Sequence, residues 1–239
     1  MRVARFILAV LVAFVLACIL YLTPLLVLPF DPDREISNRV IGRGWTGAWK
    51  ACLGLKVRVV GEENIREGGP FLFVSNHASY LDVLALYHDF PIMLRFLAKK
   101  TLVWVPIFGI AFYTLGHIYI DRRQKRGSKQ SIAALGRLAQ RGYNIFVFPG
   151  GKRASDGRLG EWKKGAFVLA TQLQMPIVPL AISGSAALHG IGDLFPRPGT
   201  VTITIGKPIS TAGATYEDRD RLLQLTRRRV EEMLDGAAA

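Results

Sequence analysis

The chain has 239 residues and half of them are apolar, so it can bury the core of one good-sized domain and still carry an appendage. Lys and Arg outnumber Asp and Glu by 31 to 18, and the net charge of +13 favours an anionic partner: nucleic acid, a phospholipid surface or a phosphorylated substrate. The two cysteines form no disulfide or zinc framework and no aromatic RNA-binding signature is present, so nucleic acid is the weakest of these partners.

The first predicted element is an apolar segment at residues 6–28, preceded by Arg2 and Arg5. As a helix it would be about 34 Å long, enough for a hydrocarbon core of roughly 30 Å. A signal peptide is the alternative, but the run is longer than a typical signal core and no small-x-small cleavage site follows, which favours a retained anchor. Basic residues flank both ends, which suits a segment that dips into the membrane and returns. A segment that crosses the membrane is the alternative, and the sequence does not decide between the two.

Residues 36–53 follow as a predicted amphipathic helix. Its apolar residues recur at helical spacing, and they are Ile36, Val40, Ile41, Trp45, Ala48, Trp49, Cys52 and Leu53. Arg39, Arg43 and Lys50 lie largely off this stripe. A helix at the membrane interface and a helix facing the protein core both have this pattern, and the position directly after an anchor favours the first. The sequence therefore predicts a membrane-associated region at residues 1–55 and a globular domain at residues 56–239.

From residue 56 onward, short β-type runs alternate with helical segments. Strands are expected at residues 57–60, 71–74, 95–98, 118–120, 145–148, 177–182 and 201–205. Helices are expected at residues 79–87, 128–140 and 165–174, and a last one after the capping pattern Thr215-x-x-Asp218. This alternation predicts an α/β fold with a mixed, largely parallel sheet of about seven strands flanked by helices.

A histidine and a carboxylate, His77 and Asp82, come directly after the strand expected at residues 71–74. A neutral imidazole whose far nitrogen is bonded to a carboxylate can remove a proton from a hydroxyl group. Residues five apart face different sides of a helix, so the two can meet only if His77 precedes a helix that Ser79 caps. Alternatively, Ser79-x-x-Asp82 is only a capping box and His77 an ordinary loop histidine. Spacing alone leaves both interpretations open.

A second turn, Gly150-Gly151-Lys152-Arg153, follows the strand expected at residues 145–148. Active groups in open α/β sheets usually sit beyond the carboxyl ends of the strands. Two glycines let backbone amides approach an anion, and the basic pair suits a phosphate. A basic surface loop has the same composition, so the turn by itself does not establish a site.

Taken in order, these segments resemble the glycerolipid acyltransferase superfamily, closest to its lysophosphatidic acid (1-acyl-sn-glycerol-3-phosphate) acyltransferases. The resemblance covers most of residues 56–207. It is carried by ordered short motifs, namely His77-x-x-x-x-Asp82, Lys99-Lys100-x-Leu102 with Pro106 and Gly109, Asp121-Arg122, Phe148-Pro149-Gly150-Gly151-Lys152-Arg153, Trp162-Lys163-Lys164-Gly165 and Pro176-Ile177-Val178-Pro179.

The resemblance implies an enzyme of the cell membrane with its catalytic domain on the cytoplasmic face. It would transfer an acyl group from acyl-CoA or acyl carrier protein to the free hydroxyl of lysophosphatidic acid and so make phosphatidic acid. The thioester is a co-substrate, and no cofactor, metal or nucleic acid is expected. His77 and Asp82 are then the catalytic residues, and the substrate-binding residues are Lys100, Arg122, Gly150, Gly151, Lys152 and Arg153.

One motif departs from the family pattern Phe-Pro-Glu-Gly-Thr-Arg. Gly150 stands where the family has glutamate, and Lys152 stands where it has threonine, which moves the local charge by about two units toward positive. Of the family's acceptor-binding Glu and Arg, only Arg153 carries over. Another lysophospholipid, an amino-acid-containing lysolipid, or a non-catalytic membrane-binding relative therefore remain as alternatives.

Residues in and around the motif Lys99-Lys100-x-Leu102 with Pro106 and Gly109 allow two interpretations each. Lys100 either stabilises negative charge on a substrate or belongs to a basic surface that faces anionic lipid. Trp104, Val105, Ile107 and Phe108 either line a groove for the acyl chain or pack in the core.

Overall fold

The computed structural model describes residues 27–105, 108–120, 125–151 and 159–238, with a few separate residues near the N-terminus (4, 6–8, 10–12 and 14–15). Its centre is a seven-stranded sheet in the order β1-β7-β6-β2-β5-β3-β4. The strands are β1 (Leu55–Val60), β2 (Leu72–Ser75), β3 (Leu94–Lys99), β4 (Ile118–Ile120), β5 (Asn144–Val147), β6 (Ile177–Ser183) and β7 (Gly199–Ile205).

The sheet is mixed and mostly parallel, as the sequence predicts. Strands β4, β3, β5, β2 and β6 run in one direction, while β7 pairs antiparallel with β6 and parallel with β1. The central strands β2 and β6 are buried on both faces, which explains their unbroken apolar sequences. Strand β7 alternates buried and half-exposed residues because only one of its faces meets the core.

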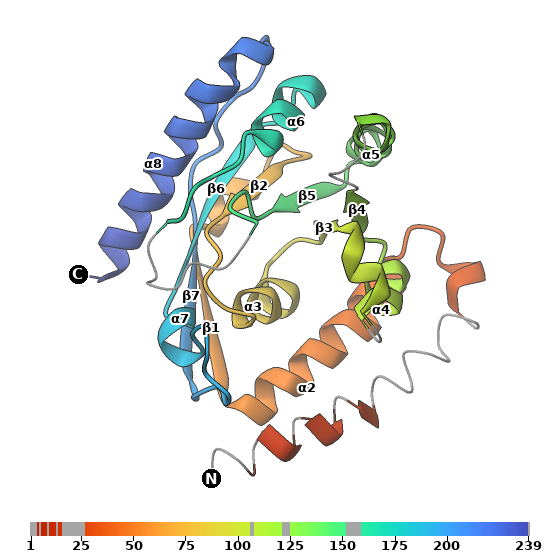
Figure 1. Cartoon of the computed structure of the whole chain (residues 1–239), viewed down its shortest axis with the longest axis vertical. Coiled ribbons are helices and arrows are strands. Elements are labelled where there is room, and N and C mark those ends of the chain that lie inside the picture. Colours follow the sequence, from red (N-terminus) through yellow and green to blue (C-terminus); the bar gives the residue numbers. More distant parts are fainter. Residues whose placement is uncertain are drawn as a thin grey trace.

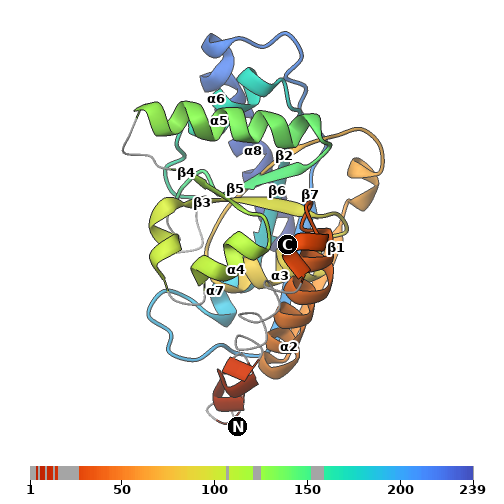
Figure 2. The same ribbon diagram turned by 90° about the vertical axis from the view of Figure 1, so that its right-hand side faces the viewer.

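Helices cover both faces of this sheet (Figures 1 and 2). On one face, α2 (Arg43–Leu53) and α3 (Leu81–Asp89) pack in a core with Phe73, Phe146 and Val201. On the other face, α5 (Lys125–Gln140), α6 (Gly165–Leu173) and α8 (Arg219–Ala238) bury residues such as Leu135, Phe167 and Leu222. The apolar side chains of these two cores are removed from water, and this burial holds the helices on the sheet.

Several short helices join these layers. They are α4 (Phe108–Thr114), α7 (Ser185–Leu188) and the shorter turns η1 (Leu28–Phe30), η2 (Ser37–Gly42), η3 (Glu62–Ile65), η4 (Lys100–Trp104) and η5 (Tyr216–Asp218). The predicted capping box at Thr215 and Asp218 is confirmed, and η5 followed by α8 begins there.

The helix expected at residues 36–53 is two pieces, the π-helical η2 and the α-helix α2. The core-facing interpretation of its apolar stripe is confirmed for α2, and the membrane-interface interpretation remains a prediction for η2. Along α2, Trp49, Cys52 and Leu53 pack against the core, whereas Ile36 and Val40, at η2, are 52% and 65% exposed. The segment is thus part of the globular fold at one end and presents apolar side chains outward at the other.

The chain that leads into η2 is tied to the sheet by Arg95, whose side chain is fully buried. Its Nη1 donates to the Leu115 carbonyl at 2.6 Å, and its Nη2 donates to the Asp33 carbonyl. Asp31 accepts from the amides of Ile36 and Ser37 at 3.2 and 2.7 Å and so holds the start of the helical segment.

The apolar segment at residues 6–28, predicted to be a membrane anchor, lies mostly outside the described residues. Within the part of the chain that the structure describes, no helix combines the length and the apolar character needed to cross a membrane. The two-helix membrane motif and the division at residue 55 remain predictions.

Candidate active site

The candidate site begins where the chain leaves β2, and Asn76 fixes that exit. Its side-chain Nδ2 donates to the Ile182 carbonyl and its Oδ1 accepts from the Ile182 amide, both at 2.8 Å. The amide group thus extends the pairing between β2 and β6 by one residue, using a side chain in place of backbone. The next residue, His77, is therefore held at the carboxyl edge of the sheet.

His77 and Asp82 meet in the turn between β2 and α3. The imidazole Nδ1 lies 2.8 Å from Asp82 Oδ2, and the same oxygen accepts from the amides of Ala78 (2.8 Å) and Ser79 (2.9 Å). The Asp82 side chain is fully buried, while 17% of the His77 side chain is exposed. A carboxylate on Nδ1 fixes the tautomer with the proton on that nitrogen, which leaves the lone pair on Nε2.

The predicted helix start is wrong in one detail. The N-cap position of α3 belongs to Tyr80, and the helix begins at Leu81. The Ser79 hydroxyl donates to the His189 carbonyl at 2.7 Å and accepts from the Leu81 amide at 3.2 Å, so it ties the turn to the end of α7. Sequence spacing cannot reveal this bond, because its partners lie 110 positions apart.

Phe148 also belongs to the site, although the sequence did not single it out. Its ring stacks on the His77 imidazole with the ring centres 4.0 Å apart and the planes 18° from parallel. The contact exists because β5, which ends at Val147, lies next to β2 in the sheet. The Phe at the start of the Phe-Pro-Gly-Gly motif was the available signal.

The remaining predicted residues follow the carboxyl ends of strands that run parallel to β2. Gly150 and Gly151 come after β5, two and three residues beyond the ring that stacks on His77, and Gly151 has a left-handed backbone with φ of 67°. Lys100 follows β3, on the far side of β5, and is exposed. Arg122, Lys152 and Arg153 lie outside the described residues.

Of the two alternatives for the residues after Lys100, packing in the core is wrong for Trp104 and Val105; Ile107 and the side chain of Phe108 lie outside what the structure describes. The Trp104 side chain is 84% exposed and Val105 is exposed as well, because η4 lies at the surface beyond β3. Across the described residues, no group of three or more His, Cys, Asp or Glu side chains is arranged to hold a metal ion.

The fold and this site define the class of protein. Residues 56–183 match the family model described as Acyltransferase, and the chain belongs to that family. Human 1-acyl-sn-glycerol-3-phosphate acyltransferase beta is 31% identical over 196 residues, which are 82% of this chain and 70% of the human protein. The mouse alpha form is 32% identical over 190 residues, 77% of this chain and 66% of its own length.

A solved structure agrees with these matches. The 1-acyl-sn-glycerophosphate (LPA) acyltransferase PlsC from Thermotoga maritima superimposes with a TM-score of 0.73 and 26% identity over 98% of both chains. The chain spans only 55% of its Chlamydomonas reinhardtii relative, so the relatives extend beyond it to different degrees. The protein is an acyltransferase of the 1-acylglycerol-3-phosphate O-acyltransferase type.

Proposed function

We propose that this protein is a membrane-bound O-acyltransferase that acylates the free hydroxyl of lysophosphatidic acid and so makes phosphatidic acid in phospholipid biosynthesis. The donor is acyl-CoA or acyl carrier protein. The observation that carries the proposal is the His77–Asp82 pair at the carboxyl edge of the sheet. The acceptor is the one named for the human, mouse and Thermotoga maritima relatives.

His77 acts as the general base. Its Nε2 removes the proton from the acceptor hydroxyl as that oxygen attacks the thioester carbonyl, and Asp82 on Nδ1 stabilises the imidazolium that forms. When the tetrahedral intermediate collapses, the carbon–sulfur bond breaks and the imidazolium returns its proton to the departing thiolate. The products are the ester and a free thiol, and no acyl-enzyme is needed.

Substrate binding falls to the groups that follow the neighbouring strands. We assign the acceptor phosphate to Arg122, Lys152, Arg153 and the Gly150–Gly151 turn, and the negative charge of the thioester oxygen or of a phosphate to Lys100. The turn part of this assignment rests on Gly150: the Gly151 amide donates to the Phe148 carbonyl at 3.2 Å and closes the turn, with the left-handed backbone of Gly151 at its end. Guanidinium groups suit phosphate because they bind it bidentately.

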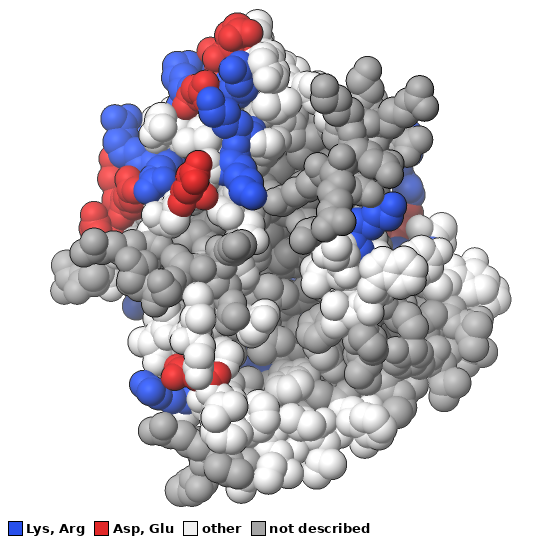
Figure 3. Space-filling model, in the orientation of Figure 1, with Lys and Arg blue, Asp and Glu red and all other residues white. Residues whose placement is uncertain are grey.

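The membrane part of the proposal rests on exposed apolar side chains. Phe30, Ile36 and Val40, from the segment that includes η1 and η2, are all exposed, as is Trp104 of η4. In Figure 3, described charged residues of both signs gather along α8, whereas described side chains over the lower part of this face are mostly uncharged. We propose that residues 1–55 hold the protein on the cytoplasmic face of the cell membrane, next to its lipid acceptor.

An acceptor panel tests the proposal. The purified full-length protein is given oleoyl-CoA or oleoyl acyl carrier protein with one lysolipid at a time, and thiol release and product mass are followed. We expect release with lysophosphatidic acid, roughly tenfold or more above lysophosphatidylcholine or an amino-acid lysolipid, because a phosphomonoester carries more negative charge than a phosphodiester and no cationic headgroup that arginine and lysine would repel. If the protein acylates another lysolipid but not lysophosphatidic acid, the proposed acyl-transfer reaction stands and the proposed acceptor is wrong.

Gly150 is the residue that supports an acceptor other than lysophosphatidic acid, because the glutamate of the family motif is absent at this position. The positive φ belongs to Gly151 and not to Gly150, so a side chain at position 150 meets no backbone strain. Gly150→Glu should therefore fold normally and change the ranking of acceptors in the same panel. An unchanged ranking would show that position 150 does not contact the acceptor.

A further inference from the structure

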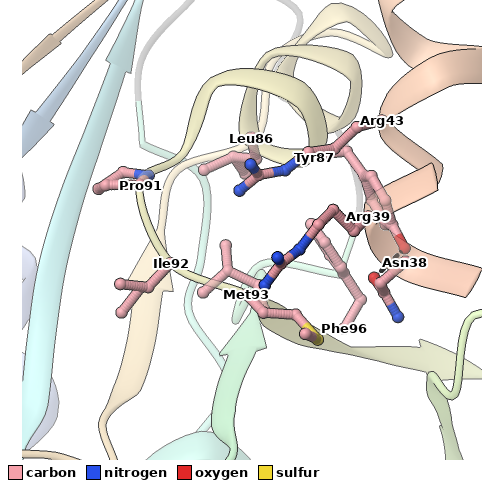
Figure 4. Close-up of a pocket in the computed structure, with 10 residues that line it drawn as sticks. Asn38, Arg39, Arg43, Leu86, Tyr87, Pro91, Ile92, Met93 and Phe96 are labelled. Carbon is pink, nitrogen blue, oxygen red and sulfur yellow. Dashed lines mark hydrogen bonds between the residues drawn. The ribbon is translucent and has the colours of Figure 1, made fainter. Parts of the chain in front are cut away.

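A pocket lies at the opposite edge of the sheet from His77. It has a volume of about 180 Å³ and lies between η2, α2, α3 and the chain that enters β3 (Figure 4). Helix α3 runs from Leu81, beside the catalytic turn, to Asp89, and Leu86 and Tyr87 at its far end line the pocket. Because β3 is parallel to β5 and β5 to β2, Leu94 at the start of β3 is on the amino edge. The pocket is therefore separate from the proposed acyl-transfer site.

Two arginines carry the charge of this pocket. Arg39 and Arg43 extend their guanidinium groups over it, and none of its ten lining residues is acidic (Figure 4). Arg43 Nη2 donates to the Phe90 carbonyl at 3.2 Å, which orients that side chain. Arg39 is exposed, and no hydrogen bond or ion pair joins it to another described residue. Two guanidinium groups at one pocket repel each other unless an anion lies between them.

The other polar groups of the pocket are already satisfied. The Asn38 side chain donates to the carbonyls of Arg34 and Leu115 and accepts from the Tyr87 hydroxyl. The two arginines are consequently the donors available to a ligand. They suit a phosphate, which accepts bidentate hydrogen bonds from guanidinium groups.

The rest of the pocket is apolar, with Leu86, Ile92, Met93 and Phe96 among its walls. Its volume is below the roughly 300 Å³ at which pockets for whole drug-sized ligands begin, so it takes a headgroup and the adjoining carbons of a larger molecule. A ligand with a phosphate at one end and an apolar body is an amphiphile of the phospholipid kind.

The neighbouring surface indicates where such a ligand comes from. Ile36, three positions before Arg39, and Val40, directly after it, expose their side chains to the outside. Exposed apolar residues close to arginine on a short helical segment are typical of a segment at the headgroup level of a bilayer. A bilayer that contacts Ile36 and Val40 would present its headgroups to Arg39.

We propose that Arg39 and Arg43 form a second phosphate site that binds the headgroup of an anionic membrane phospholipid at the amino edge of the sheet. It adds to the proposed function a lipid that is neither acceptor nor product of the reaction. This lipid site rests on the proposed membrane location of the enzyme, and it does not depend on which lysolipid is the acceptor.

Lipid binding by the full-length protein in neutral detergent micelles tests this site. The micelles are titrated with phosphatidylglycerol, and bound lipid per protein is measured after gel filtration; inorganic phosphate is the second probe. We expect saturable phosphatidylglycerol binding, weakened about tenfold or more by Arg39→Gln and further by Arg39→Gln with Arg43→Gln. Inorganic phosphate should displace the lipid only in large excess.

The matched control is Arg228→Gln with Arg229→Gln on α8, which removes the same charge from exposed side chains elsewhere. Equal loss in this control, or full binding by the double pocket variant, would overturn the site. Phosphate that binds as tightly as the lipid would overturn the membrane source. Since Arg43 also bonds to Phe90, the single Arg39 variant keeps the test valid if the double variant unfolds. Thiol release by the wild type is recorded separately, so a failed acyltransferase proposal is distinguishable from a failed lipid site.

Discussion

Asp82 shows how one atom can join the fold to the proposed chemistry. Its Oδ2 accepts from the imidazole of His77 and from two backbone amides of the same turn, so the carboxylate that shapes the turn also holds the ring. The capping and the catalytic interpretations of His77-x-x-x-x-Asp82 are thus compatible. The sequence could predict the partners from their spacing, but the shape of the turn, which lets one oxygen serve all three donors, arises only on folding.

Phe148 is the residue of the site that the sequence did not predict. Its contact with His77 joins positions 71 apart in the chain, and it depends on β5 lying beside β2. Strand order within a sheet is decided by the packing of both faces at once, so a local motif carries little information about it. The stack leaves the imidazole little freedom to rotate away from the plane that Asp82 also favours.

We expect Phe148→Leu to lower kcat by roughly two- to tenfold with little change in KM for the thioester, since aromatic pairs contribute about 0.5–1.5 kcal/mol beyond area burial. Phe148→Tyr keeps the ring and should retain most of the activity. Steady-state kinetics of both variants check this positioning role. Equal kcat for Phe148→Leu and the wild type would contradict it, and a change in thermal stability alone would not support it.

At the scale of elements, all of the expected strands exist, with ends shifted by at most two residues. For example, the run expected at residues 145–148 is the strand Asn144–Val147, and the run at 201–205 is Gly199–Ile205. Buried strands are apolar over their whole length, so their signal is strong even without neighbours. Their ends depend on backbone pairing with other strands and are harder to predict.

Helix α4 was not predicted, because its sequence is rich in aromatic and β-branched residues that favour strands. Tertiary packing decides its conformation. A side chain at Gly109 would come within 2.1 Å of the Val103 carbonyl oxygen, so the glycine permits a close approach between α4 and η4. Phe112 of the same helix packs edge-on against His117, which follows it.

His117 joins α4 to β3 as a neutral buried ring. Its Nδ1 accepts from the Phe96 amide at 3.3 Å, and complete burial, with a smaller contribution from Arg95, lowers the pKa of His117 to about 3. In the unfolded chain its pKa is 6.5, so the unfolded state binds the extra proton first as the pH falls. The stability that depends on neutral His117 is complete above pH 6.5 and is lost progressively toward pH 3.

We therefore expect His117→Gln to flatten the acid side of the stability profile. Between pH 7.5 and pH 5 the wild type should lose about 2 kcal/mol more unfolding free energy than the variant. Urea unfolding at the two pH values measures this difference in slope, which is independent of any constant cost of the substitution. Parallel profiles for the two proteins would show that His117 is not held neutral in the fold.

At the scale of the molecule, parallel pairing brings the ends of separate strands to one edge. The sequence predicts the α/β class and the mostly parallel sheet, and the structure confirms both. It could not predict that β7 reverses direction next to β6, because that depends on the connection through α7 and on the partner β1. The same edge holds His77, the Gly150–Gly151 turn and Lys100, which local motifs alone could not bring together.

The exposed apolar surface around η2 is the part of the fold that sequence patterns predict least well. One amphipathic stripe at residues 36–53 divides into a core-facing helix, α2, and an outward-facing segment around η2. Helical periodicity identifies an apolar face, but the same face suits a protein core or a bilayer. The packing of α2 on α3 is what makes the α2 part of the stripe face the core while the η2 part stays exposed.

The central claim is that His77, held by Asp82, removes the proton from the hydroxyl of lysophosphatidic acid. The most direct test is the initial rate of phosphatidic acid formation from lysophosphatidic acid and oleoyl-CoA or oleoyl acyl carrier protein by the wild type, His77→Ala and Asp82→Asn, with circular dichroism to confirm folding. We predict a loss of roughly a hundredfold or more for His77→Ala and a smaller loss for Asp82→Asn. A folded His77→Ala variant that makes phosphatidic acid at the wild-type rate would contradict the claim.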